Sequence, residues 1–367
     1  MSDSLSFVVT RRSPAVRWAG TPVYHARPVS DDTRGKPVSR HASGVTRLAP
    51  SPTGALHLGN ARTFLVTWAI ARRAGWRIVL RVEDLDSPRV KPGATESCIS
   101  LLEWLGMDWD VGPIVQSHDL EPHVEAMRLL AKEGHVYPCE LSRSEIEAAA
   151  SAPHDEPMRA AGETPSPSFG GREVRFPPEL RPPLTPRDFD ERETNWRFAV
   201  PTGADGVVRF HDAIAGPRAI SPADTIGDFV VWTRRAQPAY QLAVVVDDHR
   251  QGITDIIRGN DLLDSAARQL LLYRALGFAP EPRYLHLPLV VGPDGRRLAK
   301  RHGDTRLDTY RARGVSPERI IGLLARWCGI DADEMDAREF SDRLDPATMP
   351  GSAAVMRPED ERWLLKG

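Results

Sequence analysis

VTRLAPSPTGALHLGNAR, residues 45–62, is the stretch of sequence that decides the fold. Its first residues, Val45–Leu48, predict a buried strand, and a turn rich in proline and glycine follows them. Apolar residues then recur at helical spacing from Leu56 to Ala74, and Gly75 predicts the end of that helix. Arg77–Val82 is rich in β-branched residues and predicts a second strand. Because strand, helix and strand form a βαβ unit, we expect a Rossmann-type, doubly wound parallel α/β sheet that binds its ligand at the first strand-to-helix turn.

The composition is that of a globular chain with enough apolar residues for a sizeable core, since 41% of the 367 residues are hydrophobic and 27% are charged. This length suggests two domains or one elaborated α/β domain. No apolar stretch reaches the ~18 residues of a membrane span, and the N-terminus lacks the apolar core of a secretory signal. Three cysteines, far apart and odd in number, argue against a disulfide framework. We therefore expect a cytoplasmic monomer without membrane contact.

Residues 1–44 differ from the rest of the chain in charge. They carry a formal charge of +4, whereas the whole chain carries −2. We predict a flexible basic extension. The interpretations that stay open are a leader without a function of its own, a start codon placed too early, or a basic arm that contacts nucleic acid.

The remaining chain alternates strands and helices around a proline-rich break. After the extension we expect the first half of the α/β domain at 45–141, a proline-rich insertion at 142–200, the second half at 201–310 and a short helical tail at 311–367. Further strands are predicted at 196–200, 207–210, 228–232, 240–246 and 285–291. Further helices are predicted at 95–105, 122–134, 259–276, 305–313 and 317–328, after which the periodic pattern ends.

The turn before the first helix has the features of a phosphate site. Gly54 and Gly59 let the backbone approach a ligand closely, and His57, Gly59 and Asn60 lie in the first helical turn. Backbone N–H groups and the positive end of the helix dipole bind anions there, and an imidazole adds a donor. Taken alone, a histidine at a helix start is usually structural.

A second candidate is the cationic loop between Gly295 and Gly303, which contains Arg297, Lys300 and Arg301. Such a loop can stabilise the charge that develops on a leaving pyrophosphate. In isolation, a basic turn is by default a solvated surface.

Together the two elements resemble the HIGH and KMSKS signatures of class I aminoacyl-tRNA synthetases. The HIGH-like motif consists of His57, Leu58, Gly59 and Asn60, and the KMSKS-like motif of Arg297, Leu298, Ala299, Lys300 and Arg301. Asparagine replaces the second histidine, and arginine and alanine replace the usual first lysine and serine. The resemblance implies that ATP, with Mg²⁺, is bound by His57, Gly59, Asn60 and Lys300. It assigns catalytic roles to His57, Asn60 and Lys300.

Three further segments, Arg81–Asp86, Tyr240–His249 and Gly252–Asp261, resemble glutamyl-tRNA synthetases. The resemblance implies L-glutamate as a substrate, and the residue types fit its charges. A carboxylate pairs with the ammonium, and forked guanidinium groups bind carboxylates. The residues that the resemblance assigns to L-glutamate are Arg47, Ser51, Glu83, Tyr240 and Arg258.

Few residues follow Arg301, too few for the helical anticodon-binding domains of glutamyl-tRNA synthetases. The chain therefore resembles the subfamily of glutamyl-Q tRNA(Asp) synthetases, which activate glutamate and transfer it to queuosine in the anticodon of tRNA(Asp). With this resemblance we expect the inserted subdomain to contact the acceptor nucleic acid. Two alternatives remain. One is a truncated glutamyl-tRNA synthetase that charges the 3′ end of tRNA(Glu), and the other is a non-catalytic synthetase paralogue.

The subfamily often carries a zinc site that begins with Cys-x-Cys after Tyr-Pro. In this sequence Cys139 follows Tyr137-Pro138, but Leu141 occupies the second cysteine position and His154 stands alone. Since a structural zinc needs about four nitrogen or sulfur ligands, we expect no metal site of this kind.

Overall fold

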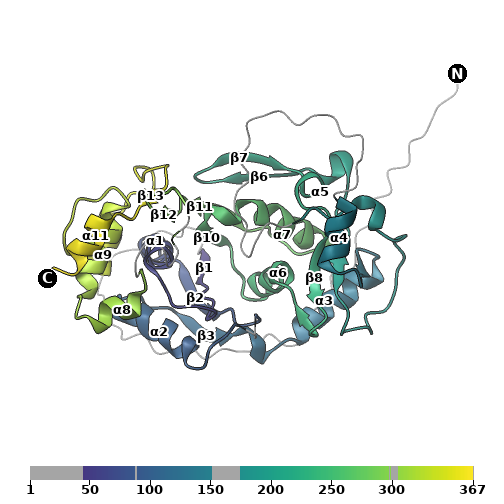
Figure 1. Cartoon of the computed structure of the whole chain (residues 1–367), viewed down its shortest axis with the longest axis horizontal. Coiled ribbons are helices and arrows are strands. Elements are labelled where there is room, and N and C mark those ends of the chain that lie inside the picture. The colour runs from purple at the N-terminus through teal and green to yellow at the C-terminus, as the bar shows by residue number, and fades with distance from the viewer. Residues whose placement is uncertain (1–43, 87–88, 151–173, 297, 299–304, 367) are drawn as a thin grey trace, which may run out of the picture.

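The predicted βαβ unit is present in the computed structural model, which describes residues 44–86, 89–150, 174–296, 298 and 305–366. Strand β1 (Val45–Leu48) lies parallel to β2 (Arg77–Val82), and α1 (Leu58–Ala74) connects them (Figure 1). Helix α1 ends at Gly75, whose φ of 68° is a left-handed conformation that glycine adopts without strain.

Two groups of parallel strands meet to form the central sheet. β3 (Val111–Val115) pairs with β2, and β10 (Asp255–Gly259) pairs with β11 (Arg283–Leu287). The groups join at β1 and β10, where the N–H of Thr254 donates to the carbonyl oxygen of Val45 at 2.9 Å. Beyond β11 the sheet continues with β6 (Val208–Asp212), which is parallel to β11, and ends with the antiparallel edge strand β7 (Gly216–Ile220). The resulting order, β3-β2-β1-β10-β11-β6-β7, has the parallel core of a doubly wound α/β sheet, so the predicted fold class is confirmed.

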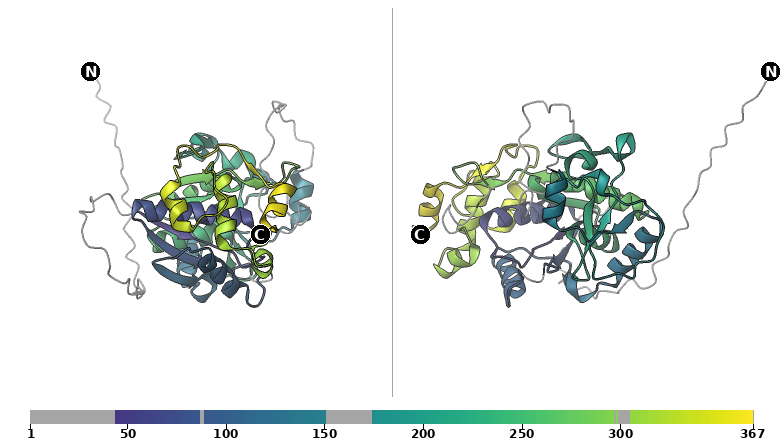
Figure 2. Two further views of the ribbon diagram at one scale, coloured as in Figure 1. Left: turned by 90° about the vertical axis from the view of Figure 1, so that its left-hand side faces the viewer. Right: turned by 45° about the vertical axis from the view of Figure 1, so that its right-hand side comes forward.

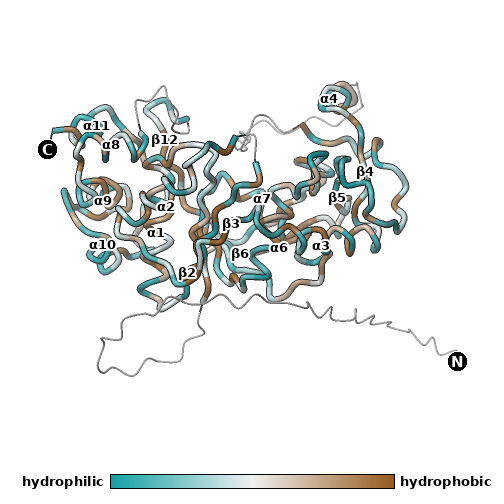
Figure 3. The backbone as a smooth tube through the Cα atoms, turned by 90° about the horizontal axis from the view of Figure 1, so that it is seen from below, coloured by the Kyte–Doolittle hydropathy of each residue, from teal (hydrophilic) through white to brown (hydrophobic). Residues whose placement is uncertain are grey.

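Helices cover both faces of this sheet because its strands are apolar on both sides. Val79 packs in one hydrophobic cluster and its neighbour Leu80 in another, as expected from the alternation of side chains along a strand. The cluster of Leu80 includes α1 and α2 (Ala94–Trp104), whereas that of Val79 includes α3 (Glu121–Lys132) and two later helices. In Figure 3 the hydrophobic stretches lie mostly along the strands and inner helices.

Those two later helices are α6 (Tyr240–Arg250) and α7 (Leu263–Ala275). The prediction of a strand at Tyr240–Val246 is wrong, because this apolar run forms the first two turns of α6. Gln241 to Asp248 are all buried, so the helix has no polar face and its sequence lacks a helical stripe. A short apolar run of this kind fits a buried strand and a buried helix equally well.

The second half of the sheet also differs in detail from the prediction. Strand β10 was not predicted. The single strand expected at 285–291 is two strands, β11 and β12 (Val290–Val291), separated at Pro288-Leu289. A proline lacks the N–H that a continuous ladder needs.

An antiparallel sheet lies beside the central one at the opposite end of the elongated molecule from the C-terminal helices (Figure 2). Its strands are β4 (Val136–Pro138), β5 (Trp196–Phe198), β8 (Phe229–Thr233) and β9 (Gln237–Pro238). β4 precedes the proposed insertion at 142–200, β5 lies within it, and β8 and β9 follow it. The division of the chain there stays a proposal. The other short elements of the chain up to α7 are helices α4 (Arg143–Ala150) and α5 (Pro222–Thr225) and 3₁₀ turns at Gln116–His118, Pro178–Leu180, Gly203–Gly206 and Asn260–Leu262.

The chain continues as regular structure after residue 328, where the sequence pattern ended. Ser341 in α10 donates to the carbonyl oxygen of Ala69 in α1 at 3.1 Å, and Phe340 is buried in the same core as α1. The helix is only two turns long, which gives too few residues for a visible period. Before residue 328 lie α8 (Leu307–Ala312) and α9 (Pro317–Arg326), where helices were predicted. After it follow α10 (Ala337–Arg343), β13 (Ala354–Val355) and α11 (Pro358–Leu364). In the part of the chain that the structure describes, every helix is too short or too polar to cross a membrane.

Ala236, in the tight turn between β8 and β9, has a φ of 54°. This left-handed conformation costs a residue with a Cβ about 1–2 kcal/mol. Ala236→Gly is therefore expected to raise the free energy of unfolding by roughly 0.5–1 kcal/mol, after the larger entropy loss of glycine is subtracted. Urea unfolding followed by circular dichroism measures the change. The same substitution at the exposed strand residue Ala219 is the control and should lower stability; a loss of stability at both positions would contradict the strain at Ala236.

Candidate active site

The predicted glutamate-binding residues converge where the two halves of the sheet meet. Arg47 lies near the carboxyl end of β1, Glu83 directly follows β2, and Arg258 lies near the carboxyl end of β10. β1 and β10 are neighbours from which the chain winds in opposite directions, and ligands of doubly wound sheets bind outside such a point.

A buried carboxylate on α6 forms the charged floor of this site. Oδ1 of Asp248 accepts from Nε of Arg47 at 3.2 Å and from Nη1 of Arg81 at 2.7 Å. Arg81 also donates from Nη2 to Oε1 of Glu83 at 2.9 Å. Burial raises the pKa of Glu83, although the neighbouring Arg81 and Arg47 oppose this change. The network therefore fixes Glu83 at the end of β2 with the positive charges beside it.

Arg258 differs from these arginines because the partners that the structure gives it are neutral. Nε donates to Nε2 of His286 at 2.9 Å, Nη1 to Oε1 of Gln269 at 2.9 Å and Nη2 to the carbonyl oxygen of Leu262 at 3.2 Å. A guanidinium has five N–H donors, so these contacts leave one N–H on each Nη without a partner among the described residues. The buried Arg258 thus holds a positive charge that suits a substrate carboxylate.

Tyr240, the first residue of α6, is at the mouth of the site with 42% of its surface exposed. Desolvation and then the carboxylate of Glu83 raise the pKa of its hydroxyl, whereas Arg258 and Arg47 lower it. The hydroxyl therefore lies within the electrostatic reach of the three other residues. Four of the five residues that the sequence assigned to glutamate are brought together.

The fifth, Ser51, is exposed in the turn that follows β1. This turn is attached to the site, because the N–H of Glu83 donates to the carbonyl oxygen of Pro50 at 2.9 Å. A hydrogen bond from the Ser51 hydroxyl to glutamate stays a prediction.

The HIGH-like motif begins α1 with a capping box. Nδ1 of His57 accepts from the N–H of Asn60 at 3.4 Å, and Oδ1 of Asn60 accepts from the N–H of His57 at 3.5 Å. Since Nδ1 accepts, a neutral imidazole carries its proton on Nε2, the tautomer that can donate to an anion. Gly59 lies beside the ring, and a Cβ there would come within 3.3 Å of it. The side chains of the motif are thus arranged around the helix N-terminus.

The chain that follows the KMSKS-like motif is joined to the same helix start. The carbonyl oxygen of Thr305 accepts from the N–H of Leu58 at 2.9 Å, and the N–H of Leu307 donates to the carbonyl oxygen of Leu56 at 2.9 Å. These two bonds make Arg306 and His57 an isolated antiparallel β-bridge. Of the motif itself, Leu298 is buried. The predictions for Arg297, Ala299, Lys300 and Arg301 lie outside the described residues.

Four buried residues of the site were not predicted: Arg81, Asp248, Asp212 and His286. Arg81 and Asp248 could have been predicted from the sequence. Each is a charged residue next to an apolar run, in a segment that resembles glutamyl-tRNA synthetases. Asp212 and His286 meet across 74 positions of sequence, and no local pattern indicates such a contact.

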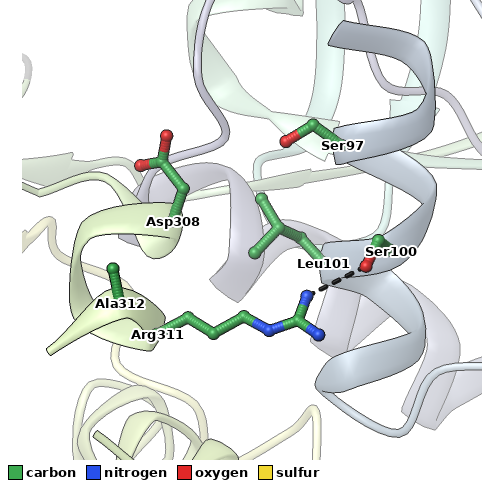
Figure 4. A pocket seen from close by; sticks show the side chains of 6 residues that line it. All are labelled: Ser97, Ser100, Leu101, Asp308, Arg311 and Ala312. Carbon is green, nitrogen blue, oxygen red and sulfur yellow. Dashed lines mark hydrogen bonds between the residues drawn. The ribbon is translucent and has the colours of Figure 1, made fainter. Parts of the chain in front are cut away.

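A separate pocket of about 330 Å³ opens between α2 and α8 (Figure 4). Arg311 crosses it and donates to the hydroxyl of Ser100 at 2.9 Å. None of the residues predicted to bind glutamate or ATP is among those that line it, which are Ser97, Ser100, Leu101, Asp308, Arg311 and Ala312.

The segment compared with a zinc site packs as an apolar cluster. Cys139 is buried beside Tyr137 and Phe176, and Leu141 packs against the same cluster. In the part of the chain that the structure describes, no group of three or more histidine, cysteine, aspartate or glutamate side chains is arranged to hold a metal ion. The absence of zinc stays a prediction.

Comparison with known proteins gives one family. The model of the catalytic domain of class I tRNA synthetases (E and Q) matches residues 44–350. The chain is 48% identical over 299 residues to a glutamyl-Q tRNA(Asp) synthetase of Rhodopirellula baltica, covering 80% of this chain and 87% of that protein. It is 35% identical over 320 residues to a glutamate–tRNA ligase of Geobacter sulfurreducens, covering 87% of this chain and 64% of that protein. The crystal structure of a glutamate tRNA ligase from Elizabethkingia meningosepticum, in complex with its amino acid, superposes with a TM-score of 0.67 at 26% identity, covering 88% of this chain and 68% of that one.

Proposed function

The chain belongs to the class I tRNA synthetases of the E and Q type, and from this premise we propose that it activates L-glutamate with ATP and transfers it to queuosine in the anticodon of tRNA(Asp). The resemblance to this family is confirmed by the matched residues 44–350. The identity of 48% to a glutamyl-Q tRNA(Asp) synthetase, against 35% to a glutamate–tRNA ligase, favours queuosine as the acceptor. The observation that carries glutamate as the substrate is the convergence of Arg47, Glu83, Tyr240 and Arg258.

The charges of the site match those of glutamate. Three arginines, Arg47, Arg81 and Arg258, face two carboxylates, Asp248 and Glu83, which leaves one net positive charge when all are ionised. Glutamate carries one net negative charge, and glutamine carries none. Bound glutamine would leave buried donors of the site without a charged partner. The free-energy cost of these donors would favour glutamate over glutamine.

In the first step, an oxygen of the glutamate α-carboxylate attacks the α-phosphorus of ATP, and the bond to pyrophosphate breaks. Arg47 and Arg258 bind the carboxylates of the amino acid, and Glu83 binds its ammonium. The N-terminus of α1, with Nε2–H of His57 and the amide of Asn60, faces the phosphates, and Mg²⁺ bound to ATP would neutralise part of their charge. Catalysis rests on positioning and charge stabilisation rather than on a covalent enzyme intermediate.

In the second step, a hydroxyl of the queuosine cyclopentenediol attacks the activated carbonyl of glutamyl-adenylate, and AMP leaves. No side chain is assigned as general base for this step. The monomeric state and the cytoplasmic location stay predictions.

Pyrophosphate exchange tests the activation step. Purified protein with ATP and labelled pyrophosphate, but no tRNA, is expected to form labelled ATP with glutamate and not with glutamine. Glutamate binding by calorimetry without any exchange would support the non-catalytic paralogue and contradict the proposal.

Lys300→Ala is expected to lower the rate of this exchange about a hundredfold, since one donor to the charge of the transition state contributes about 3 kcal/mol. The KM for glutamate should stay within about threefold, because the resemblance places Lys300 on ATP. Steady-state exchange kinetics measure both quantities. The matched control is Lys132→Ala, which removes the same charge at the end of α3 and should change neither; an unchanged rate in Lys300→Ala would remove Lys300 from the mechanism.

A further inference from the structure

Arg258 is the first of three buried side chains that are joined by hydrogen bonds, and the last of them is a carboxylate. Nε2 of His286, on β11, accepts from Nε of Arg258 at 2.9 Å, and Nδ1 of His286 lies 2.7 Å from Oδ2 of Asp212 on β6. The exposed fraction is 5% for Arg258, 1% for His286 and 0% for Asp212. Neither the sequence motifs nor the binding of glutamate accounts for this series of hydrogen bonds.

The hydrogen bonds fix the tautomer of His286. The guanidinium Nε is always a donor, so Nε2 of the imidazole must accept, and the proton of a neutral ring must lie on Nδ1. The only partner of that N–H among the described residues is Asp212, a carboxylate that can only accept when ionised. Burial lowers the pKa of His286 to about 4, so the ring is neutral at physiological pH.

Asp212 is itself held by the turn between β6 and β7. Oδ1 accepts from the backbone N–H groups of Ile214 at 3.0 Å and Ala215 at 2.7 Å. Burial raises the pKa of Asp212, but the hydrogen bonds from His286 and from these amides outweigh it and keep the pKa below its usual value. Oδ2 also accepts from the backbone N–H of His286 at 3.1 Å. The carboxylate therefore presents Oδ2 as a fixed acceptor to both the backbone and the ring of His286.

We propose that Asp212 and His286 form a positioning relay, in which the neutral imidazole orients Arg258 and separates its positive charge from Asp212, leaving that charge for a carboxylate of the substrate. A carboxylate placed directly on Arg258 would neutralise it, as Asp248 partly does for Arg47 and Arg81. The imidazole supplies the acceptor without the negative charge. This inference rests on the proposed glutamate site and makes Asp212 and His286 determinants of amino-acid affinity.

Asp212→Asn tests the tautomer. If Oδ1 of the new amide keeps the N–H groups of Ile214 and Ala215, its NH₂ faces both Nδ1 and the backbone N–H of His286. The imidazole proton then moves to Nε2, and two donors, Nε2–H of His286 and Nε–H of Arg258, face each other without an acceptor. If the amide turns round, its NH₂ confronts the two backbone donors instead. In pyrophosphate exchange the KM for glutamate should rise about tenfold or more, the cost of a buried donor left without an acceptor, while kcat and the KM for ATP stay within about threefold.

His286→Gln supplies the rescue, because the glutamine amide can place Oε1 near the position of Nε2 whatever residue 212 offers. Its KM for glutamate should rise by less than about threefold. The double variant D212N/H286Q should recover most of the loss caused by Asp212→Asn, since only the bond from the backbone N–H of residue 286 to Oδ2 is not restored. If Asp212 acted only by holding the β6–β7 turn, the double variant would keep the KM of Asp212→Asn, and the relay would be refuted.

Asp255→Asn is the matched control. Asp255 is a buried carboxylate three positions before Arg258 on β10. Its partners are the surface residue Arg283 and the hydroxyl of Thr254, neither of which contacts Arg258, so the KM for glutamate should not change. Should Asp212→Asn fail to fold by circular dichroism, His286→Leu removes the acceptor but keeps Asp212. A wild-type KM in that variant overturns the relay.

Absence of glutamate-dependent exchange in the wild-type protein would instead overturn the proposed function itself.

Discussion

Arg258→Ala is expected to raise the KM for glutamate in pyrophosphate exchange at least about a hundredfold. Loss of one member of a buried, hydrogen-bonded charge pair costs about 2–5 kcal/mol, and every 1.4 kcal/mol corresponds to a factor of ten in affinity. The upper part of this range applies because Arg258 is 5% exposed and its described partners, His286, Gln269 and Leu262, carry no negative charge. Glutamate titrations at saturating ATP measure the effect.

Two variants separate the charge of Arg258 from its geometry. Arg258→Lys keeps the charge but not the three donors to neutral partners, so it should recover only part of the affinity. Arg283→Ala removes an exposed arginine from the neighbouring strand β11, outside the site, and should leave the KM unchanged. If Arg258→Ala saturated at the wild-type concentration of glutamate, its assignment to a substrate carboxylate would be wrong.

The fold was predictable where local signals agreed. Helix α1 has apolar residues at helical spacing and a glycine at its end, and β2 is rich in β-branched residues, so both were predicted within about two residues. Helix α6 was not, because residues 241–248 are buried on every side and no polar stripe marks their period. β10 was missed for a related reason: Asp255 and Arg258 interrupt its apolar residues, and both are buried only because distant residues pair with them.

The site was predictable where it lies within a motif. Glu83, Tyr240 and Arg258 were assigned from the segments that contain them, and the structure brings them to one point with Arg47. The groups that hold them were not, since Asp248 meets Arg47 across 201 positions and Asp212 meets His286 across 74. Contacts of this kind depend on strand order, which the sequence indicated only as a class of fold.

The RNA that accepts glutamate is the remaining determinant of function. We expect transfer to depend entirely on the presence of the modified base in that RNA. Transfer of labelled glutamate is expected to tRNA(Asp) that contains queuosine, and not to the same tRNA transcribed without it, because only queuosine offers the cyclopentenediol hydroxyls. Exposed basic residues, such as Arg234 and Arg235 in the turn between β8 and β9, suit the phosphates of an anticodon loop. Contacts to phosphate position an RNA without specifying it, so recognition falls to the modified base.

The control for this prediction is removal of the 3′-terminal adenosine from the tRNA. Glutamate attached to queuosine should survive this truncation, because the reacting hydroxyl lies in the anticodon, whereas charging of a 3′ end should be abolished by it. Acid-precipitable glutamate, measured for intact and truncated tRNA in parallel, distinguishes the two. Robust charging of unmodified tRNA(Glu) that disappears with the terminal adenosine would contradict transfer to queuosine and favour a glutamyl-tRNA synthetase that acts at the 3′ end.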